Sequence, residues 1–571
     1  MTSSVAFDTV ALDRALRTLQ QQKQIWEVLA VDKKIEMLLE TRYLLGHYAA
    51  EWVRRSIEAK GLDPSSPWIG EEWVTGPWAI AEVINGYIET LKAIAEGRLP
   101  HLPRIRTRPD GQVMVQVFPR TLYDRLILNG ITADVWMQPD VTEETLYNEI
   151  GTLYRKPTHE GVVVLVLGAG NLNSIPPLDV LYHMIVRGHV AMLKMNPVND
   201  YLDPLIEAIF APFIRTGFLR VVSGGAEVGE YLTQHPDVDE IHLTGSARTH
   251  DAIVYGTGPE GTARRIHNQP LITKPMTSEL GGVGPLIVLP GRWSAEDIRY
   301  HAEHAVTMKL HNNGFNCVAS QLIVLADCWE QKDEFMAAVR QVMRELPQRP
   351  AYYPGAAERQ RAAIAAHPHA ETFGGEVPRT LIANINPTQD DYCFQNELFG
   401  PVFAQTSLPG EDAATFLRNA VEFCNQRLMG TLGASILGHP RTLRQLKTQL
   451  DQAIADLRYG AIGVNIWAAA AFLIAEGTWG AFPGHTEDNI QSGTGVVRNA
   501  LMLDRPQKTV VHGSFYPFPR SWLHGDFNIS PKPPWFVTNR TACRTARLVT
   551  ALAVDPHLLR LPPIFALALR G

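Results

Sequence analysis

Two side chains in this sequence have the chemical types of a nucleophile and its base. Cys317 ends the polar segment from Asn312 to Cys317, and Glu279 precedes the pair Gly281-Gly282. A cysteine nucleophile with a nearby carboxylate base performs thioester formation and hydrolysis. A lone cysteine is more often a small buried hydrophobe, by roughly four to one. The glycine and asparagines before Cys317 favour the reactive interpretation. We expect a helix to begin at Cys317 and to lower the thiol pKa through its N-terminal dipole.

Three further segments are polar or glycine-rich where expected strands end. They are Gly168 to Asn173, Lys194 to Pro197 and Thr244 to Ser246. In the last of them, a Gly-Ser pair before a helix would offer backbone N–H groups and a hydroxyl to a phosphate. Each segment alone is more often a plain turn, by roughly two to one. Three such segments on one sheet favour a nucleotide, although the ordinary GxGxxG dinucleotide turn is absent.

The elements that would position these residues alternate along the chain. Helical spacing of apolar residues covers about 9–98, and an Asp-Gly turn within 106–117 predicts a hairpin. From 161 to about 243, buried strands alternate with helices, which predicts a doubly wound α/β domain. A second α/β run covers about 285–490, and Val510-Val511 is interpreted as a returning strand.

Composition narrows the class of protein. The chain has 571 residues, 52 Lys plus Arg against 59 Asp plus Glu, and a formal net charge of −7, which argues against a nucleic-acid partner. Five cysteines without a CxxC pair exclude a disulfide scaffold and predict no metal site. The N-terminus has no secretory pattern, and the longest apolar run, 466–475, is too short to span a bilayer. We expect a cytoplasmic protein without a membrane span.

The order of the motifs along the chain is more specific than any one of them. The stretch from Val221 to Ser246 is close in residue types and spacing to a known pattern. The full set is Asn171, Lys194, Gly224-Gly225, Thr244-Gly245-Ser246, Glu279-Leu280-Gly281-Gly282, Cys317 and Glu397-Leu398-Phe399-Gly400-Pro401. With these motifs, the sequence resembles the NAD(P)-dependent aldehyde dehydrogenase superfamily over roughly residues 10 to 513, as a divergent member.

The resemblance implies an α/β fold of the aldehyde-dehydrogenase type, with two doubly wound α/β domains and a small β oligomerisation hairpin. It also implies a homodimer or homotetramer. A C-terminal appendage lies outside the common pattern. The expected boundaries are 1–104 and 155–278 for the cofactor-binding domain, 279–490 for the catalytic domain, 105–154 and 491–514 for the bridging segment, and 515–571 for the appendage.

The resemblance also implies roles for single residues in oxidising a small-molecule aldehyde to a carboxylic acid. Cys317 would attack the aldehyde, Asn171 and the Cys317 backbone N–H would form the oxyanion hole, and Glu279 would activate the hydrolytic water. The cofactor would be NAD or NADP. Its expected contacts are Lys194 at the adenosine ribose, Gly245 and Ser246 at the pyrophosphate, Glu397 and Phe399 around the nicotinamide ribose, and Gly225, Gly229 and Leu280 elsewhere along the cofactor.

Several positions depart from the family pattern. Gly170 replaces a tryptophan, Val180 replaces a lysine, and about ten residues are inserted around 256–261. Two alternatives stay open: a CoA-acylating enzyme, which usually lacks the carboxylate at the Glu279 position, and a catalytically silent binding or structural protein. The sequence does not identify the aldehyde. Trp467, Phe472 and Trp479 could line an apolar pocket, although core packing is favoured by roughly two to one for each.

The appendage from about residue 515 is rich in aromatic residues, leucine and arginine. Its apolar content predicts that it is covered rather than free in water. It could pack near the substrate entrance, on its own or a partner subunit, or lie on a membrane surface. The net charge of −7 favours packing on protein.

Overall fold

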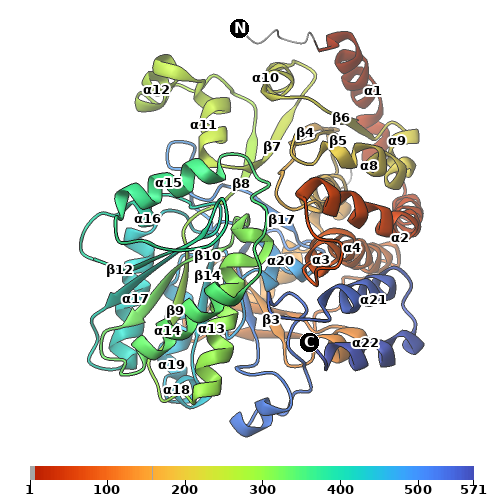
Figure 1. Cartoon of the computed structure of the whole chain (residues 1–571). Coiled ribbons are helices and arrows are strands. Elements are labelled where there is room, and N and C mark those ends of the chain that lie inside the picture. Colours follow the sequence, from red (N-terminus) through yellow and green to blue (C-terminus); the bar gives the residue numbers. More distant parts are fainter. Residues whose placement is uncertain (1–6, 157–158) are drawn as a thin grey trace.

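The computed structural model describes residues 7–156 and 159–571 (Figure 1). Residues 1–6 and 157–158, which fall inside the expected cofactor-binding domain, lie outside the described residues. The chain forms two large sheets with helices around them, which confirms the predicted α/β class. The smaller sheet has five parallel strands in the order β6-β5-β4-β7-β8. Their bounds are β4 (Val163–Leu167), β5 (Val190–Lys194), β6 (Leu219–Val222), β7 (Glu240–Gly245) and β8 (Met276–Leu280).

Two strands of this sheet, β4 and β5, are buried throughout and almost wholly apolar. Continuous apolar runs of this kind suit parallel strands that helices cover on both faces. The helices that connect or cover these strands are α7 (Ile175–Leu181), η4 (Tyr182–Val186), η5 (Asp200–Leu202), α8 (Asp203–Ile209), α9 (Ala211–Arg215), α10 (Ala226–Gln234), α11 (Ala247–Tyr255) and α12 (Gly258–Ile266).

The larger sheet has eleven strands in the order β1-β2-β3-β18-β15-β14-β9-β10-β13-β12-β11. Its central strands are parallel, and the predicted hairpin, β1 with β2, extends it through the antiparallel pairing of β3 with β18. The bounds are β1 (Arg104–Thr107), β2 (Val113–Phe118), β3 (Thr132–Met137), β9 (Gly284–Val288), β10 (Ser320–Ala326), β11 (Glu371–Phe373), β12 (Arg379–Ile385), β13 (Val402–Leu408), β14 (Gly433–Leu437), β15 (Ala461–Val464) and β18 (Pro506–His512).

Helices and short elements fill the rest of this half of the molecule. A separate pair of short strands, β16 (Thr478–Gly480) and β17 (Val496–Arg498), lies outside both sheets. The other elements are α5 (Leu122–Ile127), α6 (Glu143–Leu146), η2 (Tyr147–Glu149), η3 (Thr152–Arg155), α13 (Ala295–Leu310), η6 (His311–Gly314), α14 (Lys332–Glu345), α15 (Ala356–Ala366), α16 (Tyr392–Gln395), α17 (Ala413–Arg427), α18 (Pro440–Gln445), α19 (Lys447–Asp456) and α20 (Ala470–Leu473).

The C-terminal segment packs on helices between residues 31 and 95 of its own chain, and Figure 1 shows the blue C-terminal helices beside these red helices. The Trp68 indole donates a hydrogen bond of 2.8 Å to the Val537 carbonyl. In the described part of the chain, no helix is long and apolar enough to cross a membrane. The elements are α1 (Thr9–Glu27), α2 (Val31–Lys60), α3 (Ile69–Trp73), η1 (Val74–Trp78), α4 (Ala79–Ala95), η7 (Arg520–His524), α21 (Ala542–Val554), η8 (Leu558–Arg560) and α22 (Leu561–Ala568).

The contact between α21 and α3 predicts a stability effect at Gly70. A side-chain carbon at Gly70 would lie 2.6 Å from the backbone carbonyl carbon of Ala542. The contact cannot be relieved by rotating a side chain, because the neighbouring atom belongs to the backbone. We expect Gly70→Ala to lower the free energy of unfolding by about 1–3 kcal/mol through overpacking. The matched control is Gly229→Ala in α10, because within the described residues no neighbouring atom lies within 4 Å of that position. Thermal unfolding of both variants measures the effect, and an unchanged Tm for Gly70→Ala would contradict this packing.

Candidate active site

The expected nucleophile and base lie where the two sheets meet. Glu279 is the fourth residue of β8, the last strand of the smaller sheet, and β9 of the larger sheet begins at Gly284. Cys317 lies between η6 and β10. The carboxyl end of one strand and the amino end of another therefore bring these residues to one place. Each affects the other's pKa, so they are close enough to interact.

The loop before Cys317 has an uncommon backbone. Asn312, Asn313 and Gly314 have φ angles of 50°, 53° and 80°. Asparagine tolerates this left-handed region better than most residues, and glycine adopts it freely, which accounts for the residue types at these positions. A side chain at Gly314 would also overlap the Gly400 carbonyl, so the loop packs closely on the segment that follows Glu397.

The expected helix at Cys317 is wrong. Residues 317–318 form a turn, and the buried strand β10 begins at Ser320. The apolar run that follows forms a buried strand between two parallel neighbours, which overrides the helical interpretation. No helix dipole therefore lowers the thiol pKa at this position.

The electrostatics of the site favour protonated forms of both groups. Burial raises the pKa of the Cys317 thiol well above its usual range, and the Glu279 and Glu397 carboxylates add to the effect. Burial also raises the pKa of Glu279 to about 8, helped by the charge of Asp179 and opposed by contacts with Trp479 and Cys317. Both Glu279 carboxylate oxygens are enclosed and lack a hydrogen-bond partner in the described residues. Glu279 is thus a carboxyl group that ionises near pH 8, beside the thiol.

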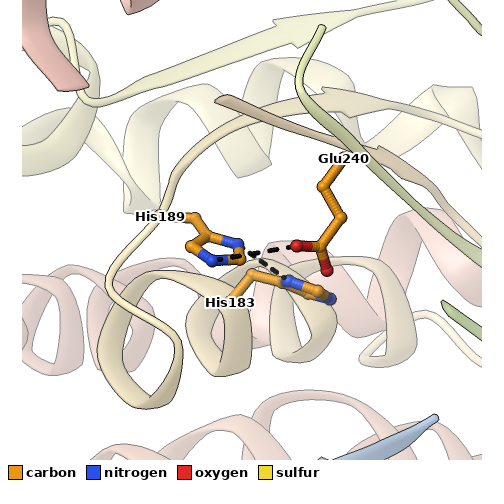
Figure 2. Close-up of side chains that lie close together, drawn as sticks. All are labelled: His183, His189 and Glu240. Carbon is orange, nitrogen blue, oxygen red and sulfur yellow. Dashed lines mark hydrogen bonds and ion pairs between the residues drawn. The ribbon is translucent and has the colours of Figure 1, made fainter. Parts of the chain in front are cut away.

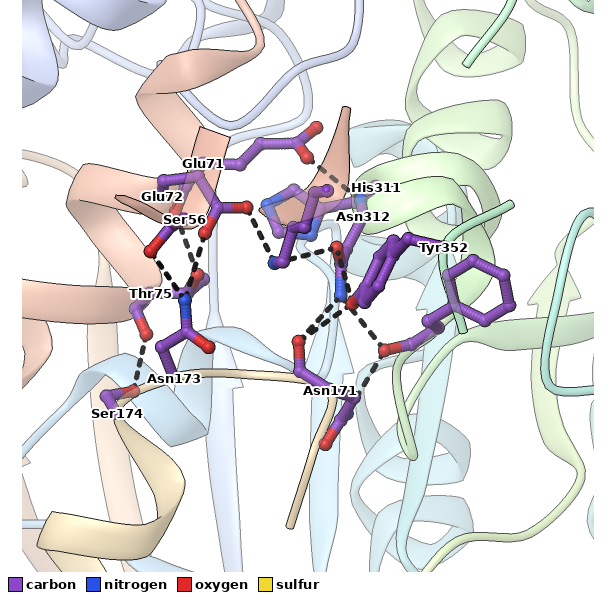
Figure 3. Close-up of polar contacts among 12 residues, drawn as sticks. Ser56, Glu71, Glu72, Thr75, Asn171, Asn173, Ser174, His311, Asn312 and Tyr352 are labelled. Atoms are coloured by element: carbon purple, nitrogen blue, oxygen red, sulfur yellow. Dashed lines mark hydrogen bonds and ion pairs between the residues drawn. The ribbon is translucent and has the colours of Figure 1, made fainter. Parts of the chain in front are cut away.

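Asn171 is held against the Cys317 loop (Figure 3). Its side-chain amide donates a 3.0 Å hydrogen bond to the Phe315 carbonyl, two residues before Cys317. Its own backbone carbonyl accepts hydrogen bonds from the Tyr352 hydroxyl at 2.9 Å and the Asn312 side chain at 3.2 Å. The structure therefore brings together the expected oxyanion-hole amide and the segment that carries the nucleophile.

A buried ionic network supports this loop from the N-terminal helices. The Arg349 guanidinium donates to both oxygens of Glu71, at 2.9 and 2.6 Å, and the Asn312 backbone N–H donates to Glu71 at 3.0 Å. Lys60 pairs with Glu72 at 2.7 Å, and all four charged side chains are at most 6% exposed. The sequence indicates this network only through two adjacent acids within the apolar stretch 68–74.

The expected cofactor contacts on the smaller sheet lie at its carboxyl edge. Lys194 ends β5 and Gly245 ends β7, while Gly225 and Gly229 belong to the start of α10 after β6. Burial lowers the pKa of Lys194 below its usual value, and the charges of Glu227, Asp200 and Asp203 offset only part of this shift. The Ser246 hydroxyl caps α11 by accepting from the Thr249 N–H at 3.2 Å. A glycine-lined edge with open space at Gly229 fits a dinucleotide that approaches the backbone closely.

The remaining expected contacts lie next to Glu279 and the Cys317 loop. Leu280 is fully buried, and Glu397 packs so closely on Gly281 that any side chain there would overlap it. Burial raises the pKa of Glu397 to about 8, with Lys309 and Arg359 opposing the shift. The Phe399 ring lies 5.7 Å from that of Phe315. The enclosed Glu397 Oε1 has no partner in the described residues, which fits a site that receives a hydroxyl-bearing ligand.

Cys317 lines a small apolar cavity of about 40 Å³. Trp467, Phe472 and Trp479 line it too, so these three buried side chains belong to the core and also form the wall of the site. Trp535 of the C-terminal segment completes this wall. The sequence analysis did not identify Trp535 as a site residue, because nothing in the sequence fixes where the appendage packs.

A group of possible metal ligands lies away from this site. His183, His189 and Glu240 are buried, and their ligand atoms lie within 4.8 Å of one another (Figure 2). Glu240 begins β7 and His189 precedes β5, so the group lies at the amino edge of the smaller sheet, opposite the expected cofactor contacts. The positive charge of Arg187 acts on both His189 and Glu240, which disfavours a divalent cation.

The sequence is similar to those of known aldehyde dehydrogenases. The model of the aldehyde dehydrogenase family matches residues 204–471. An NADP-dependent succinate-semialdehyde dehydrogenase of Deinococcus radiodurans is 28% identical over 359 residues, which cover 55% of this chain and 70% of that protein. Alignments with two further relatives cover 36% and 49% of those proteins.

Solved structures show the same fold. An NAD-dependent aldehyde dehydrogenase of Sinorhizobium meliloti superimposes with a TM-score of 0.59 at 17% identity, over 89% of this chain and 88% of that one. An NADP-dependent glyceraldehyde-3-phosphate dehydrogenase of Bacillus halodurans, solved with NADP, has the same score and identity over 89% and 92%. These matches support membership of the superfamily of NAD(P)-dependent aldehyde dehydrogenases.

The raised pKa of Glu279 predicts a pH-dependent stability difference. The folded protein retains a proton that the unfolded chain loses above the ordinary pKa of 4.5, so this group lowers stability as pH rises toward its folded pKa of about 8. The slope is at most about 1.4 kcal/mol per pH unit. We expect Glu279→Gln to gain stability over the wild type as pH rises from about 5 to 8. If the Tm values of the two proteins change with pH in parallel, the pKa of Glu279 is not raised by burial.

Proposed function

We propose that this protein oxidises an aldehyde to a carboxylic acid through a covalent intermediate on Cys317. The observation that carries the proposal is the joint position of Cys317, Glu279 and Asn171. Asn171 is hydrogen-bonded to the Cys317 loop, and Glu279 interacts with the thiol in an enclosed site. This combination supplies a nucleophile, a base and an oxyanion donor.

The proposed chemistry begins when the Cys317 sulfur forms a bond to the aldehyde carbon while the thiol proton passes to Glu279. The Asn171 side-chain amide and the Cys317 N–H stabilise the developing oxyanion. A bound nicotinamide would supply the hydride acceptor, and loss of hydride from the thiohemiacetal carbon would leave a thioester on Cys317. Glu279 first releases the thiol proton to solvent. It then takes a proton from water, which attacks the thioester. The carbon–sulfur bond breaks, and the acid leaves with the thiol restored.

We also propose that the cofactor lies between the two groups of expected contacts. Lys194, Gly225, Gly229, Gly245 and Ser246 would hold its adenosine and phosphates at the carboxyl edge of the smaller sheet. Leu280, Glu397 and Phe399 would surround the nicotinamide end. The closeness of Glu397 to Gly281 supports this arrangement, because the second group then lies beside Glu279. On the basis of the family resemblance, we also propose that the protein forms a homodimer or homotetramer.

The nucleophile predicts the outcome of one substitution. Cys317→Ala should abolish aldehyde oxidation and leave cofactor binding nearly intact, because the thiol supplies the covalent step. Cys328→Ala, which changes an exposed cysteine, is the matched control and should keep full activity. Production of reduced cofactor and cofactor titration by fluorescence measure the two properties. Substantial oxidation by Cys317→Ala would overturn the assignment and favour another chemistry.

The proposed role of Glu279 as a base predicts how its substitution changes the time course of cofactor reduction. Glu279→Gln keeps the shape of the side chain and removes the basic carboxylate. We expect a burst of reduced cofactor that equals the enzyme concentration but is slower than the first turnover of the wild type, because the thiol loses its base. Still slower turnover should follow as the thioester accumulates. A burst at the wild-type rate would show that another group takes the thiol proton, and loss of the burst would show that attack by the thiol depends wholly on Glu279. Product analysis of the wild type with and without CoA tests the acylating alternative, for which a thioester of CoA would be the product.

The residue three positions after Lys194 predicts that the protein can use NADP⁺ as well as NAD⁺. Many NAD-using relatives have a glutamate there, whereas this chain has the exposed Pro197, which cannot repel a 2′-phosphate. We expect a rate with NADP⁺ within about one hundredfold of that with NAD⁺, a span of roughly 2.7 kcal/mol. Glu227 acts on Lys194 and bonds the Gly225 N–H at 3.1 Å. Glu227→Gln should therefore raise the NADP⁺/NAD⁺ ratio, and a wild-type ratio below one hundredth would contradict the prediction.

A further inference from the structure

The C-terminal segment holds Trp535 in a fixed place against the body of the protein. The Val537 carbonyl accepts from Trp68 at 2.8 Å, and the Val537 N–H donates to the Thr307 hydroxyl at 3.2 Å. The Thr538 hydroxyl donates to Glu303 at 2.9 Å. Trp535 is 8% exposed. These contacts anchor the residues just after Trp535 to α13 and to Trp68.

Trp535 separates two cavities. One is the cavity of about 40 Å³ that Cys317 lines, here called the cysteine cavity. The other, the C-terminal cavity, has a volume of about 100 Å³ and lies between the body and the segment 513–568. Trp535 and Val74 line both cavities. Ile466 lines the second cavity and its neighbour Trp467 lines the first, so the two spaces adjoin along a shared wall.

The linings of both cavities lack charge. Among the described residues, no lysine, arginine, aspartate or glutamate lines either of them. The histidines present are neutral, because burial lowers the pKa of His304 to about 3 and also lowers that of His311. A substrate carboxylate or ammonium group would be desolvated here without a partner, which is costly. The linings are instead dominated by aliphatic and aromatic side chains.

The size of the combined space suits a hydrocarbon chain. Apolar cavities of about 150 Å³ stay dry and take up ligands of the size of benzene. The cysteine cavity alone is much smaller than this, so an aldehyde of more than a few carbons has to extend into the C-terminal cavity. The shared wall of Trp535 and Val74 is where a chain would pass.

We propose that the substrate is an aldehyde with an uncharged apolar chain, whose tail passes Trp535 into the C-terminal cavity, and that Trp535 is a specificity-determining residue. This inference rests on the proposed oxidation at Cys317. It assigns to residues 515–571 the function of forming the far half of the substrate site.

The experiment compares kcat/KM for linear aldehydes from propanal to decanal, with succinic semialdehyde as the charged comparator. The wild type should gain roughly threefold to fourfold for each added methylene until the second cavity is filled. Succinic semialdehyde should be a poorer substrate than an uncharged aldehyde of equal length. No gain with length, or equal use of succinic semialdehyde, would overturn the inference while leaving the oxidation itself established.

Two variants locate the tail. Val549→Phe fills the C-terminal cavity from α21 and should lower kcat/KM for decanal at least tenfold, with a much smaller effect on propanal. Leu548→Phe, at the next position and outside the lining, is the matched control and should retain the wild-type length profile. Trp535→Ala should merge the cavities and raise the relative rate with branched and aromatic aldehydes. Equal length profiles for Val549→Phe and wild type would refute the tail site.

A binding measurement separates this inference from the proposed function. If wild-type protein oxidises none of the aldehydes, the proposed function fails. Calorimetric binding of decanal to Cys317→Ala, and to the same protein with Val549→Phe, then decides the inference. Binding that Val549→Phe weakens at least tenfold supports the tail site, and binding that is absent or unaffected overturns it.

Discussion

The buried pair of Glu71 and Arg349 is the interaction on which the geometry of the site depends. Both side chains are removed from water, so the pair is stable only with well-aligned hydrogen bonds, and loss of one partner would cost about 3–5 kcal/mol. Glu71 also accepts the backbone N–H of Asn312, which begins the left-handed segment before Cys317. The ion pair therefore fixes the start of the loop that ends at Cys317.

The same pair connects the loop to the C-terminal segment. The Arg349 guanidinium lies over the Trp68 ring, 4.6 Å from its centroid, and the Trp68 indole donates to the Val537 carbonyl. Val537 follows Trp535 by two residues. One chain of contacts thus positions the cysteine from one side and the tryptophan wall of its cavity from the other. Trp535, Phe536 and Val537 are accordingly buried, although they belong to a segment outside the common family pattern.

The sequence predicted the strands and the motifs better than their surroundings. Buried parallel strands such as β4 are continuous apolar runs, and the helices of 9–98 have a clear period, so local pattern was sufficient for them. The left-handed φ angles of Asn312 and Asn313 and the turn at Cys317 depend on contacts with distant residues, including Glu71 and Gly400. Lys309, buried in α13 with its ammonium donating to the Leu398 carbonyl at 2.9 Å, has no local signal at all. The position of Trp535 likewise depends on tertiary packing alone.

The absence of a helix at Cys317 changes where activation of the thiol has to come from. A helix dipole would stabilise the thiolate form of Cys317. Burial and the charges of Glu279 and Glu397 instead stabilise its protonated form. The carboxyl group with a pKa of about 8 is then the base available to take the thiol proton, and it reaches its basic form only near that pH. Glu279 would therefore act in both halves of the reaction, first on the thiol and later on water. The enclosure that raises both pKa values also surrounds the thiol with apolar side chains, so the proposed substrate class and the acid–base behaviour of the site have one physical cause.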